Sequence, residues 1–161
     1  MPNHNHSGLT LHLDDDAATA AFGRRLARVI APGLALYLHG DLGSGKTTLV
    51  RGLLRGLGYP GRVKSPTYAL VELYTVSRLN LYHFDFYRFR KPKEWRDAGF
   101  NEYFNDVSVC LVEWPEKAAG LLPAADLDIA LEFAGDGRDL SVRAGTESGK
   151  ACLNRLMQMP L

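Results

Sequence analysis

The stretch "GDLGSGKTT" at residues 40–48 constrains this chain more than any other feature of its sequence. It matches a phosphate-binding loop, in which a glycine and four further residues precede Gly-Lys-Thr. The run "LALYL" at residues 34–38 is apolar at every position, as in a strand covered on both faces of a parallel sheet. An amphipathic segment from about Lys46 to Leu57 predicts a helix that Gly58 closes. Because strand, loop and helix in this order are the context that the pattern requires, we expect a nucleotide site here.

Each part of the loop has a physical task in holding phosphates. Glycines adopt backbone conformations that other residues resist, so several N–H groups can converge on phosphate oxygens. Lys46 adds a charge that reaches the outer phosphates, and Thr47 places a hydroxyl where Mg²⁺ would bridge phosphate oxygens. The Asn-Lys-x-Asp signature that reads guanine is absent from the sequence, which favours ATP. The predicted nucleotide-binding residues of the loop are Gly40, Asp41, Leu42, Gly43, Ser44, Gly45, Lys46, Thr47 and Thr48.

Two acidic residues stand near the ends of apolar segments. Glu113 follows "VCLV", and Asp85 lies in the apolar and aromatic stretch "HFDFY". In an open α/β sheet the carboxyl ends of the strands border the ligand crevice, where a carboxylate can hold Mg²⁺ or orient the attacking water. Either acid taken alone could instead be a surface residue or a helix cap, and this alternative is stronger for Asp85 than for Glu113. Together with the loop, they predict a catalytic set of Lys46, Asp85 and Glu113 and a metal-binding set of Thr47, Asp85 and Glu113.

The remaining pattern predicts an α/β fold. We expect a single P-loop NTPase-type domain over residues 8–161, with a mostly parallel central sheet, antiparallel hairpin additions and flanking helices. Residues 1–7 are expected to form a disordered tail. The polar segment 88–104 is expected to be helical in part, with Pro92 in a first turn. Further strands are expected at residues 9–13, 69–74, 79–87, 107–113, 127–133 and 139–144, and further helices from Asp14–Asp16 to about Ile30 and from about Ser148.

Composition sets limits on partners and location. The net charge is +1, with 19 basic and 18 acidic side chains, so no global basic face predicts independent binding of nucleic acid. Two cysteines are too few for a disulfide framework, and neither a membrane-spanning run nor a signal-peptide pattern is present. We therefore expect a cytoplasmic protein without a membrane partner. A local basic run is the candidate for docking a partner or touching the phosphates of a nucleic acid: Arg88, Arg90, Lys91, Lys93 and Arg96.

Four stretches taken together resemble the bacterial TsaE family, also called YjeE. They are "GDLGSGKTTLVRGLLRGLG", "VKSPTYALVELY", "YHFDFYR" and "CLVEWPEKA", and the resemblance runs from about Asp16 to the C-terminal helix. This family is the ATPase of the machinery that makes threonylcarbamoyladenosine in tRNA. The departures are small, since Ser44 replaces the usual alanine of the loop and Phe86 replaces a leucine. Neither departure removes a functional group.

The resemblance implies cofactors, partners and further site residues. The implied cofactors are ATP and Mg²⁺, and the implied partners are the proteins TsaD and TsaB, with tRNA reached through them or through the basic run. Asp85 resembles the acid of the family's "HFD-x-YR" element and Glu113 that of "VEW", both linked to Mg²⁺ and hydrolysis. Thr19 matches a family threonine near the nucleotide base. Ser65, Pro66 and Thr67 resemble a switch-like loop near the outer phosphate. Trp114 and Arg138 match positions near the active site.

Three classes of function fit a single P-loop domain. The first is an ATPase that switches a loop on Mg-ATP binding and releases it on hydrolysis, with slow turnover in the absence of its partners. The second is a small-molecule kinase, for which the arginines between residues 88 and 96 would serve as a lid. The third is an interaction module with a degenerate nucleotide site, against which the intact Lys46, Thr47, Asp85 and Glu113 argue. The resemblance favours the first class.

Overall fold

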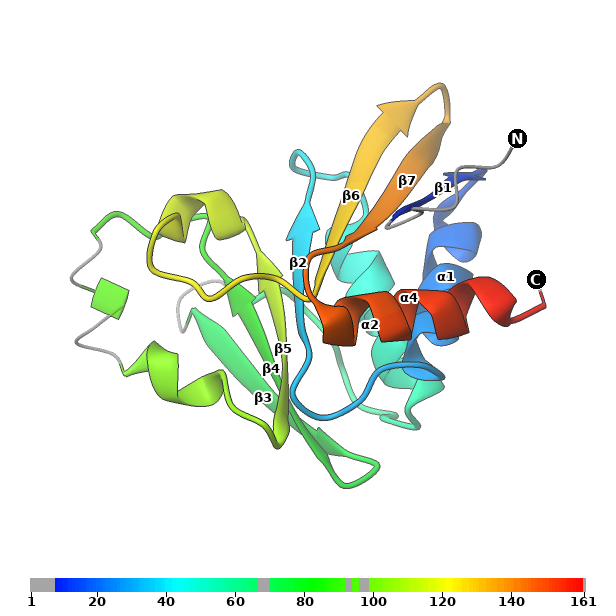
Figure 1. The fold of residues 1–161 in the computed structure, drawn as a ribbon. Coiled ribbons are helices and arrows are strands. Elements are labelled where there is room, and N and C mark those ends of the chain that lie inside the picture. The colour runs from blue at the N-terminus through cyan, green and yellow to red at the C-terminus, as the bar shows by residue number, and fades with distance from the viewer. Residues whose placement is uncertain (1–7, 67–69, 92–93, 96–98, 161) are drawn as a thin grey trace.

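The structure is a computed structural model that describes residues 8–66, 70–91, 94–95 and 99–160. The predicted tail, Thr67 of the predicted switch loop and Pro92 lie outside the described residues. Within the described ranges, a seven-stranded sheet forms the centre of the molecule and helices lie against it (Figure 1). No helix in this part of the chain has both the length and the apolar character that crossing a bilayer requires.

The sheet is parallel at its centre and antiparallel at its edges. The strand order is β1-β7-β6-β2-β5-β4-β3. The central strands β6, β2, β5 and β4 run parallel, whereas β3 pairs antiparallel with β4, and β7 and β1 extend the other edge antiparallel. The predicted α/β class with antiparallel hairpin additions is therefore confirmed. The strands are β1 (Gly8–Leu13), β2 (Ala35–His39), β3 (Val71–Val76), β4 (Leu79–Asp85), β5 (Ser108–Glu113), β6 (Leu127–Ala134) and β7 (Gly137–Ala144).

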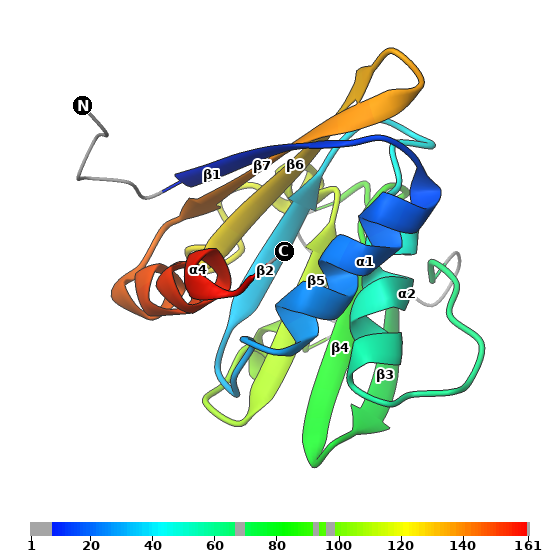
Figure 2. The ribbon, with the colours of Figure 1, turned by 90° about the vertical axis from the view of Figure 1, so that its right-hand side faces the viewer.

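Three helices cover one face of this sheet, as Figure 2 shows. They are α1 (Asp16–Ala27), α2 (Lys46–Gly56) and α4 (Glu147–Gln158). Two short 3₁₀ helices, η1 (Phe100–Tyr103) and η2 (Pro115–Ala118), pack against the opposite face of the sheet.

A helix and a strand, α1 and β4, end earlier than predicted because of local hydrogen bonds. Helix α1 ends at Ala27 instead of Ile30, because its last turn tightens and the N–H of Arg28 bonds the carbonyl of Arg25. Strand β4 ends at Asp85 instead of Tyr87, because the Asp85 carboxylate accepts the Tyr87 N–H at 2.9 Å and turns the chain.

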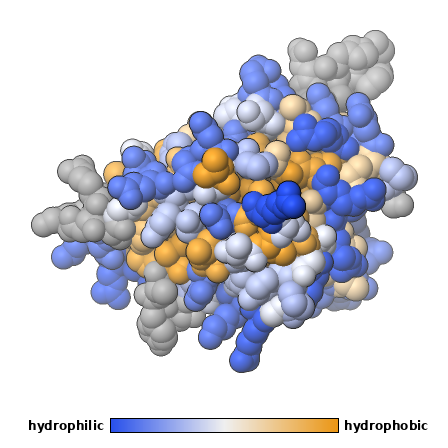
Figure 3. Space-filling model, turned by 90° about the horizontal axis from the view of Figure 1, so that it is seen from below, coloured by the Kyte–Doolittle hydropathy of each residue, from blue (hydrophilic) through white to orange (hydrophobic). Residues whose placement is uncertain are grey.

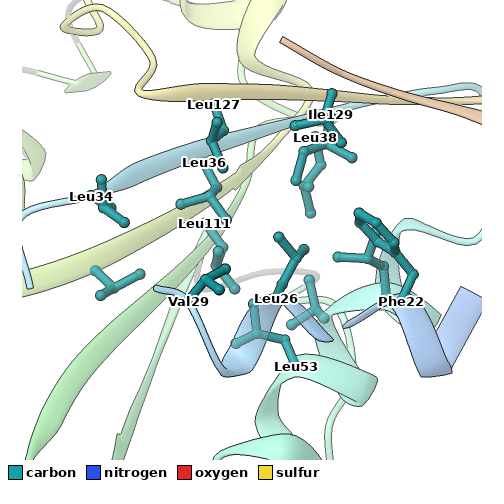
Figure 4. Close-up of a cluster of buried hydrophobic side chains, with 14 of the residues drawn as sticks. Phe22, Leu26, Val29, Leu34, Leu36, Leu38, Leu53, Leu111, Leu127 and Ile129 are labelled. Atoms are coloured by element: carbon teal, nitrogen blue, oxygen red, sulfur yellow. The ribbon is translucent and has the colours of Figure 1, made fainter. Parts of the chain in front are cut away.

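The core under the helices positions α2 against the sheet. Figure 4 shows Phe22 and Leu26 of α1 and Leu53 of α2 meeting apolar side chains of β2, β5 and β6. The helices approach closely because both contact points are glycine. A Cβ at Gly52 would lie 2.1 Å from the Ala20 carbonyl oxygen, and one at Gly23 would lie 2.2 Å from that of Leu49. The beginning of α2, and with it the loop, is thereby held in place.

An aromatic cluster covers the opposite face of the sheet. Phe84 and Phe86, which are fully buried, pack with Trp95 and with Phe100 of η1. Ring centroids in these pairs are 5.5 to 6.1 Å apart, the range of favourable aromatic packing. Both faces of the central strands are thus buried, which accounts for the apolar run in β2.

The two ends of the sheet differ in character. At the amino ends of the parallel strands lies a cavity of about 140 Å³, lined by Gly33, Ser108 and Asp126 among others. Figure 3 views the molecule from below, where hydrophobic residues form a patch among hydrophilic ones. The carboxyl ends of the parallel strands point away from this side, toward the loop at residues 40–45.

Candidate nucleotide-binding site

The loop between β2 and α2 depends on glycine conformations. Gly40, Gly43 and Gly45 have φ values of 150°, 79° and 107°, a region that side chains with a Cβ disfavour. Gly45 is the N-cap of α2 and offers no side-chain cap. By contrast, Asp15 caps α1 and Thr146 caps α4 through their side chains. The first N–H groups of α2 therefore stay available for an anion.

A cavity of about 380 Å³ opens in front of this loop. Its volume is within the range of small-ligand sites. The lining combines the loop from Leu42 to Thr48 with side chains from β4, β5 and β7, so residues far apart in the sequence meet here. Most of the predicted site residues lie in this lining: Leu42, Gly43, Ser44, Gly45, Lys46, Thr47, Thr48, Ser65, Asp85, Glu113, Trp114 and Arg138.

Lys46 is folded back on the loop. Its side chain is almost completely buried, and its Nζ donates a hydrogen bond to the carbonyl oxygen of Gly40. The same Nζ lies 3.7 Å from the ring centroid of Trp114, a cation–π contact. Burial lowers the pKa of Lys46, and the negative charges of Glu113 and Asp85 oppose this effect. An ammonium group in this position sits beside the acids and within the wall of the cavity.

The two predicted acids lie side by side. In the parallel register of β4 and β5, Asp85 stands directly opposite Glu113. The Thr47 hydroxyl is 3.5 Å from Oε2 of Glu113, and Ser65 donates to Asp85 and lies 3.4 Å from the same Oε2. Two carboxylates and two hydroxyls therefore converge at one corner of the cavity.

The corner suits Mg²⁺ rather than a metal held by the protein alone. Within the described ranges, no group of three or more His, Cys, Asp or Glu side chains is arranged as a metal site. Mg²⁺ prefers oxygen ligands and is typically held by one or two carboxylates together with substrate phosphates and water. The oxygen atoms of Thr47, Asp85 and Glu113 fit that mode of binding.

Sequence reasoning missed one residue of this corner. His83 is fully buried, and its Nε2 lies 2.6 Å from Oε2 of Glu113. The available signal was the alternation of β4, because residues two apart on a strand share a face and His83 precedes Asp85 by two. Asp16 of α1 and Tyr87 also line the cavity and were not predicted.

Arg138 of β7 holds the loop from the other side. Its Nε donates to the Ser44 carbonyl oxygen at 3.0 Å, and a second guanidinium nitrogen reaches the Gly43 carbonyl oxygen at 3.2 Å. The guanidinium carbon lies 4.4 Å from the ring centroid of Phe133. Arg138 therefore braces the backbone of the loop from β7, a strand whose predicted range began at residue 139.

Among the described residues, four predicted ones lie outside the lining of the cavity. Gly40 precedes the lining residues of the loop, and its carbonyl oxygen accepts the hydrogen bond from Lys46. Thr19 is buried beside Gly45 and donates to the Asp15 carbonyl oxygen at 3.4 Å, outside the lining of the cavity. Asp41 is exposed on the outer side of the loop. Pro66 lines a neighbouring cavity of about 210 Å³ that also reaches Asp85. Their roles toward a nucleotide stay predictions.

The fold and the site together define a class: an α/β protein of the P-loop NTPase type, with a glycine-rich loop between the central strand β2 and helix α2. Within that class, the chain belongs to the TsaE family. The model of "Threonylcarbamoyl adenosine biosynthesis protein TsaE" matches residues 13–140.

Relatives and a solved structure agree with this placement. The chain is 43% identical over 147 residues to the tRNA threonylcarbamoyladenosine biosynthesis protein TsaE of Haemophilus influenzae, covering 88% of this chain and 93% of the relative. It is 42% identical over 118 residues to the protein of that name from Bacillus subtilis, covering 73% of each. The crystal structure of Bacillus subtilis YdiB superposes with a TM-score of 0.81 at 32% identity, covering 94% of this chain and 95% of that one.

Proposed function

We propose that this chain binds Mg-ATP in the cavity and hydrolyses it, and that this turnover supports the formation of threonylcarbamoyladenosine in tRNA. The observation that carries the proposal is the contact between Thr47 of the P-loop and Glu113 of β5, with Asp85 alongside. This contact joins a phosphate-binding loop to a pair of acids at the carboxyl ends of adjacent parallel strands, where open α/β sheets bind their ligands.

The chain's own residues suggest how the triphosphate is held. The N–H groups at the beginning of α2 would bind the phosphates, and Lys46, which now donates to the Gly40 carbonyl oxygen, would turn to the outer phosphate oxygens. Thr47, Asp85 and Glu113 would hold Mg²⁺. The ion would neutralise the negative charge that develops on the transferring phosphoryl group. Glu113, the more buried acid, is the candidate for orienting the attacking water.

A switch is built around Ser65. Its hydroxyl contacts both acids, so any change in what the acids hold alters the hydrogen bonds of the loop that carries Ser65. Loops that respond in this way to the outer phosphate and its Mg²⁺ are a common device of nucleotide switches. We propose that this loop passes the state of the nucleotide to the partners.

The proposed pathway and partners follow from the family. The relatives carry the name of tRNA threonylcarbamoyladenosine biosynthesis proteins. We propose TsaD and TsaB as the proteins through which this chain acts. Since the net charge is only +1, contact with tRNA would be indirect or limited to the basic run that includes Arg88 and Arg90.

The decisive experiment measures ATP hydrolysis by the chain alone, then with TsaD and TsaB, and then with tRNA added. We expect slow turnover alone and strong stimulation by the partners, because transition-state stabilisation is incomplete without them. A Lys46→Ala variant serves as the inactive control. Absence of turnover in every mixture would contradict the proposal, and phosphorylation that depends on a small acceptor would favour a kinase instead.

A further inference from the structure

His83 lies behind the acid pair, on the face of the sheet that the helices cover. Its side chain is 0% exposed and that of Glu113 is 4% exposed. Asp85 stands two residues beyond His83 on the same face of β4 and directly opposite Glu113 of β5. His83 is not among the described residues that line the cavity, and within that part of the chain its hydrogen bond to the site is the one to Glu113.

The hydrogen bonds of the His83 ring identify its tautomer. Nε2 is 2.6 Å from the Glu113 carboxylate, so a proton lies between these atoms. Nδ1 is buried and has no hydrogen-bond partner among the described residues. A proton on Nδ1 would leave a buried N–H group without a hydrogen-bond acceptor. Such a proton is present in the cationic ring, and also in a neutral ring whose Nε2 accepts a hydrogen bond from a protonated Glu113. The arrangement without such an N–H is a neutral ring that donates its Nε2–H to the carboxylate.

This donor determines where the Glu113 carboxylate points. Oε2 is the oxygen that His83 contacts, and the same oxygen faces Thr47 at 3.5 Å and Ser65 at 3.4 Å. A glutamate side chain has several rotatable bonds, and a hydrogen bond from a buried, immobile ring removes most of that freedom. Burying a polar ring costs free energy, and an apolar side chain could fill the same space without that cost. The hydrogen bond to Glu113 accounts for a histidine at this buried position.

We propose that His83 is a positioning residue of the ATPase site, which orients Glu113 toward the P-loop threonine through its Nε2–H. The proposal rests on the proposed function, since the orientation of Glu113 matters to turnover only if this acid serves Mg²⁺ or the attacking water. His83 itself touches neither.

The kinetic test compares two variants with a matched control. His83→Leu removes the donor and keeps an apolar side chain, and should lower kcat about tenfold or more, the loss expected for a hydrogen bond to a charged group, with KM for ATP changed less than about threefold. His83→Gln retains an N–H that can reach Oε2 and should recover most of kcat. The control His12→Leu removes another histidine–carboxylate contact, 2.9 Å from Asp139 on the sheet edge, and should leave kcat unchanged.

A second readout needs neither nucleotide nor turnover. In ¹⁵N-labelled protein, long-range ¹H–¹⁵N spectra should show the His83 ring protonated at Nε2 and bare at Nδ1, with a slowly exchanging Nε2 proton that shifts in a Glu113→Ala variant. A ring protonated at Nδ1 would overturn the proposal, as would a His83→Leu variant with wild-type kcat or equal losses for leucine and glutamine. If the wild type hydrolyses no ATP, the proposed function fails, while the spectra still decide how His83 meets Glu113.

Discussion

Glu113 and Asp85 are neighbours with different surroundings. Glu113 is 3% exposed and in contact with His83, whereas Asp85 is partly exposed and also accepts the Tyr87 N–H. Under the proposed function, the buried acid would act on the attacking water molecule and the more exposed acid would meet the hydrated ion.

Replacing Glu113 with alanine should separate binding from turnover. We expect nucleotide affinity to be largely retained and kcat to fall by about 10²-fold or more, as is typical when a group that positions or deprotonates the nucleophile is lost. The measurement is ATP turnover alongside binding of a fluorescent ATP analogue. Glu102→Ala, which removes an exposed acid of η1, is the control. Full turnover by the Glu113 variant would remove this residue from the mechanism.

Lys46→Ala should instead weaken nucleotide binding itself. Loss of the ammonium group removes charged hydrogen bonds to phosphate, and affinity for Mg-ATP should fall by about 10²-fold, or about 2.7 kcal/mol. Titration calorimetry measures this directly, with Lys150→Ala on the exposed face of α4 as control. Unchanged affinity would refute the assigned phosphate site.

At the scale of single residues, the structure brings together in one cavity the predicted residues that a local pattern marks. Lys46 and Thr47 are contiguous in a motif, and Asp85 and Glu113 each stand near the end of an apolar segment. The contact of His83 with Glu113 spans 30 positions and depends on which strands are neighbours, information that no local pattern holds.

Among the elements, α1 and α2 illustrate how packing sets what sequence patterns cannot. Both helices were expected, but their close approach depends on Gly23 and Gly52 facing backbone atoms of the partner helix. The boundaries of α1 and β4 likewise follow from turn hydrogen bonds and not from apolar periodicity. The existence and type of the strands and of α1, α2 and α4 were therefore predictable, whereas the ends of α1 and β4 were not.

Gly52→Ala should destabilise the protein. Helix propensity alone would favour alanine by about 1 kcal/mol, but the added methyl would lie 2.1 Å from the Ala20 carbonyl oxygen and must push α1 away. We expect a net loss of about 2 kcal/mol in the free energy of unfolding, in the range for overpacked sites. Urea denaturation measures it, with Arg51→Ala on the exposed side of α2 as control. Equal free energies of unfolding for the two variants would show that α1 and α2 can accommodate a methyl group at this contact.

For the molecule as a whole, the cysteines report on both faces of the sheet. Cys110 lies in the aromatic cluster and Cys152 in the core under the helices, and both are buried. Burial raises the pKa of the Cys110 thiol to about 12, so its thiolate fraction at pH 8 is about 10⁻⁴. In the native protein both thiols should resist iodoacetamide, and both should become reactive at the same urea concentration. Reaction of one well before the other would mean that the two faces unfold separately.

Alkaline pH should weaken the fold. A thiol whose pKa is raised by folding ionises at lower pH in the unfolded chain than in the folded protein. The contribution of Cys110 to the free energy of unfolding is therefore complete below about pH 9 and declines as the pH rises toward 12. The decline is at most about 1.4 kcal/mol per pH unit. Burial also raises the pKa of Tyr37, which acts in the same direction. Urea denaturation at pH 8 and pH 10.5 should show the decline, and a smaller one in Cys110→Ala. An equal decline in that variant would exclude the Cys110 thiol as its cause.

The pairing of β1 with β7 has a consequence for biosynthesis. Residues 8–13 leave the ribosome well before their partner strand, which ends at Ala144, so β1 waits without this neighbour until β7 has been translated. The same late strand brings Arg138 to the carbonyl oxygens of Gly43 and Ser44. A nascent chain therefore acquires its finished edge and the brace of its phosphate-binding loop in a single late step, and chains truncated before that strand should lack both.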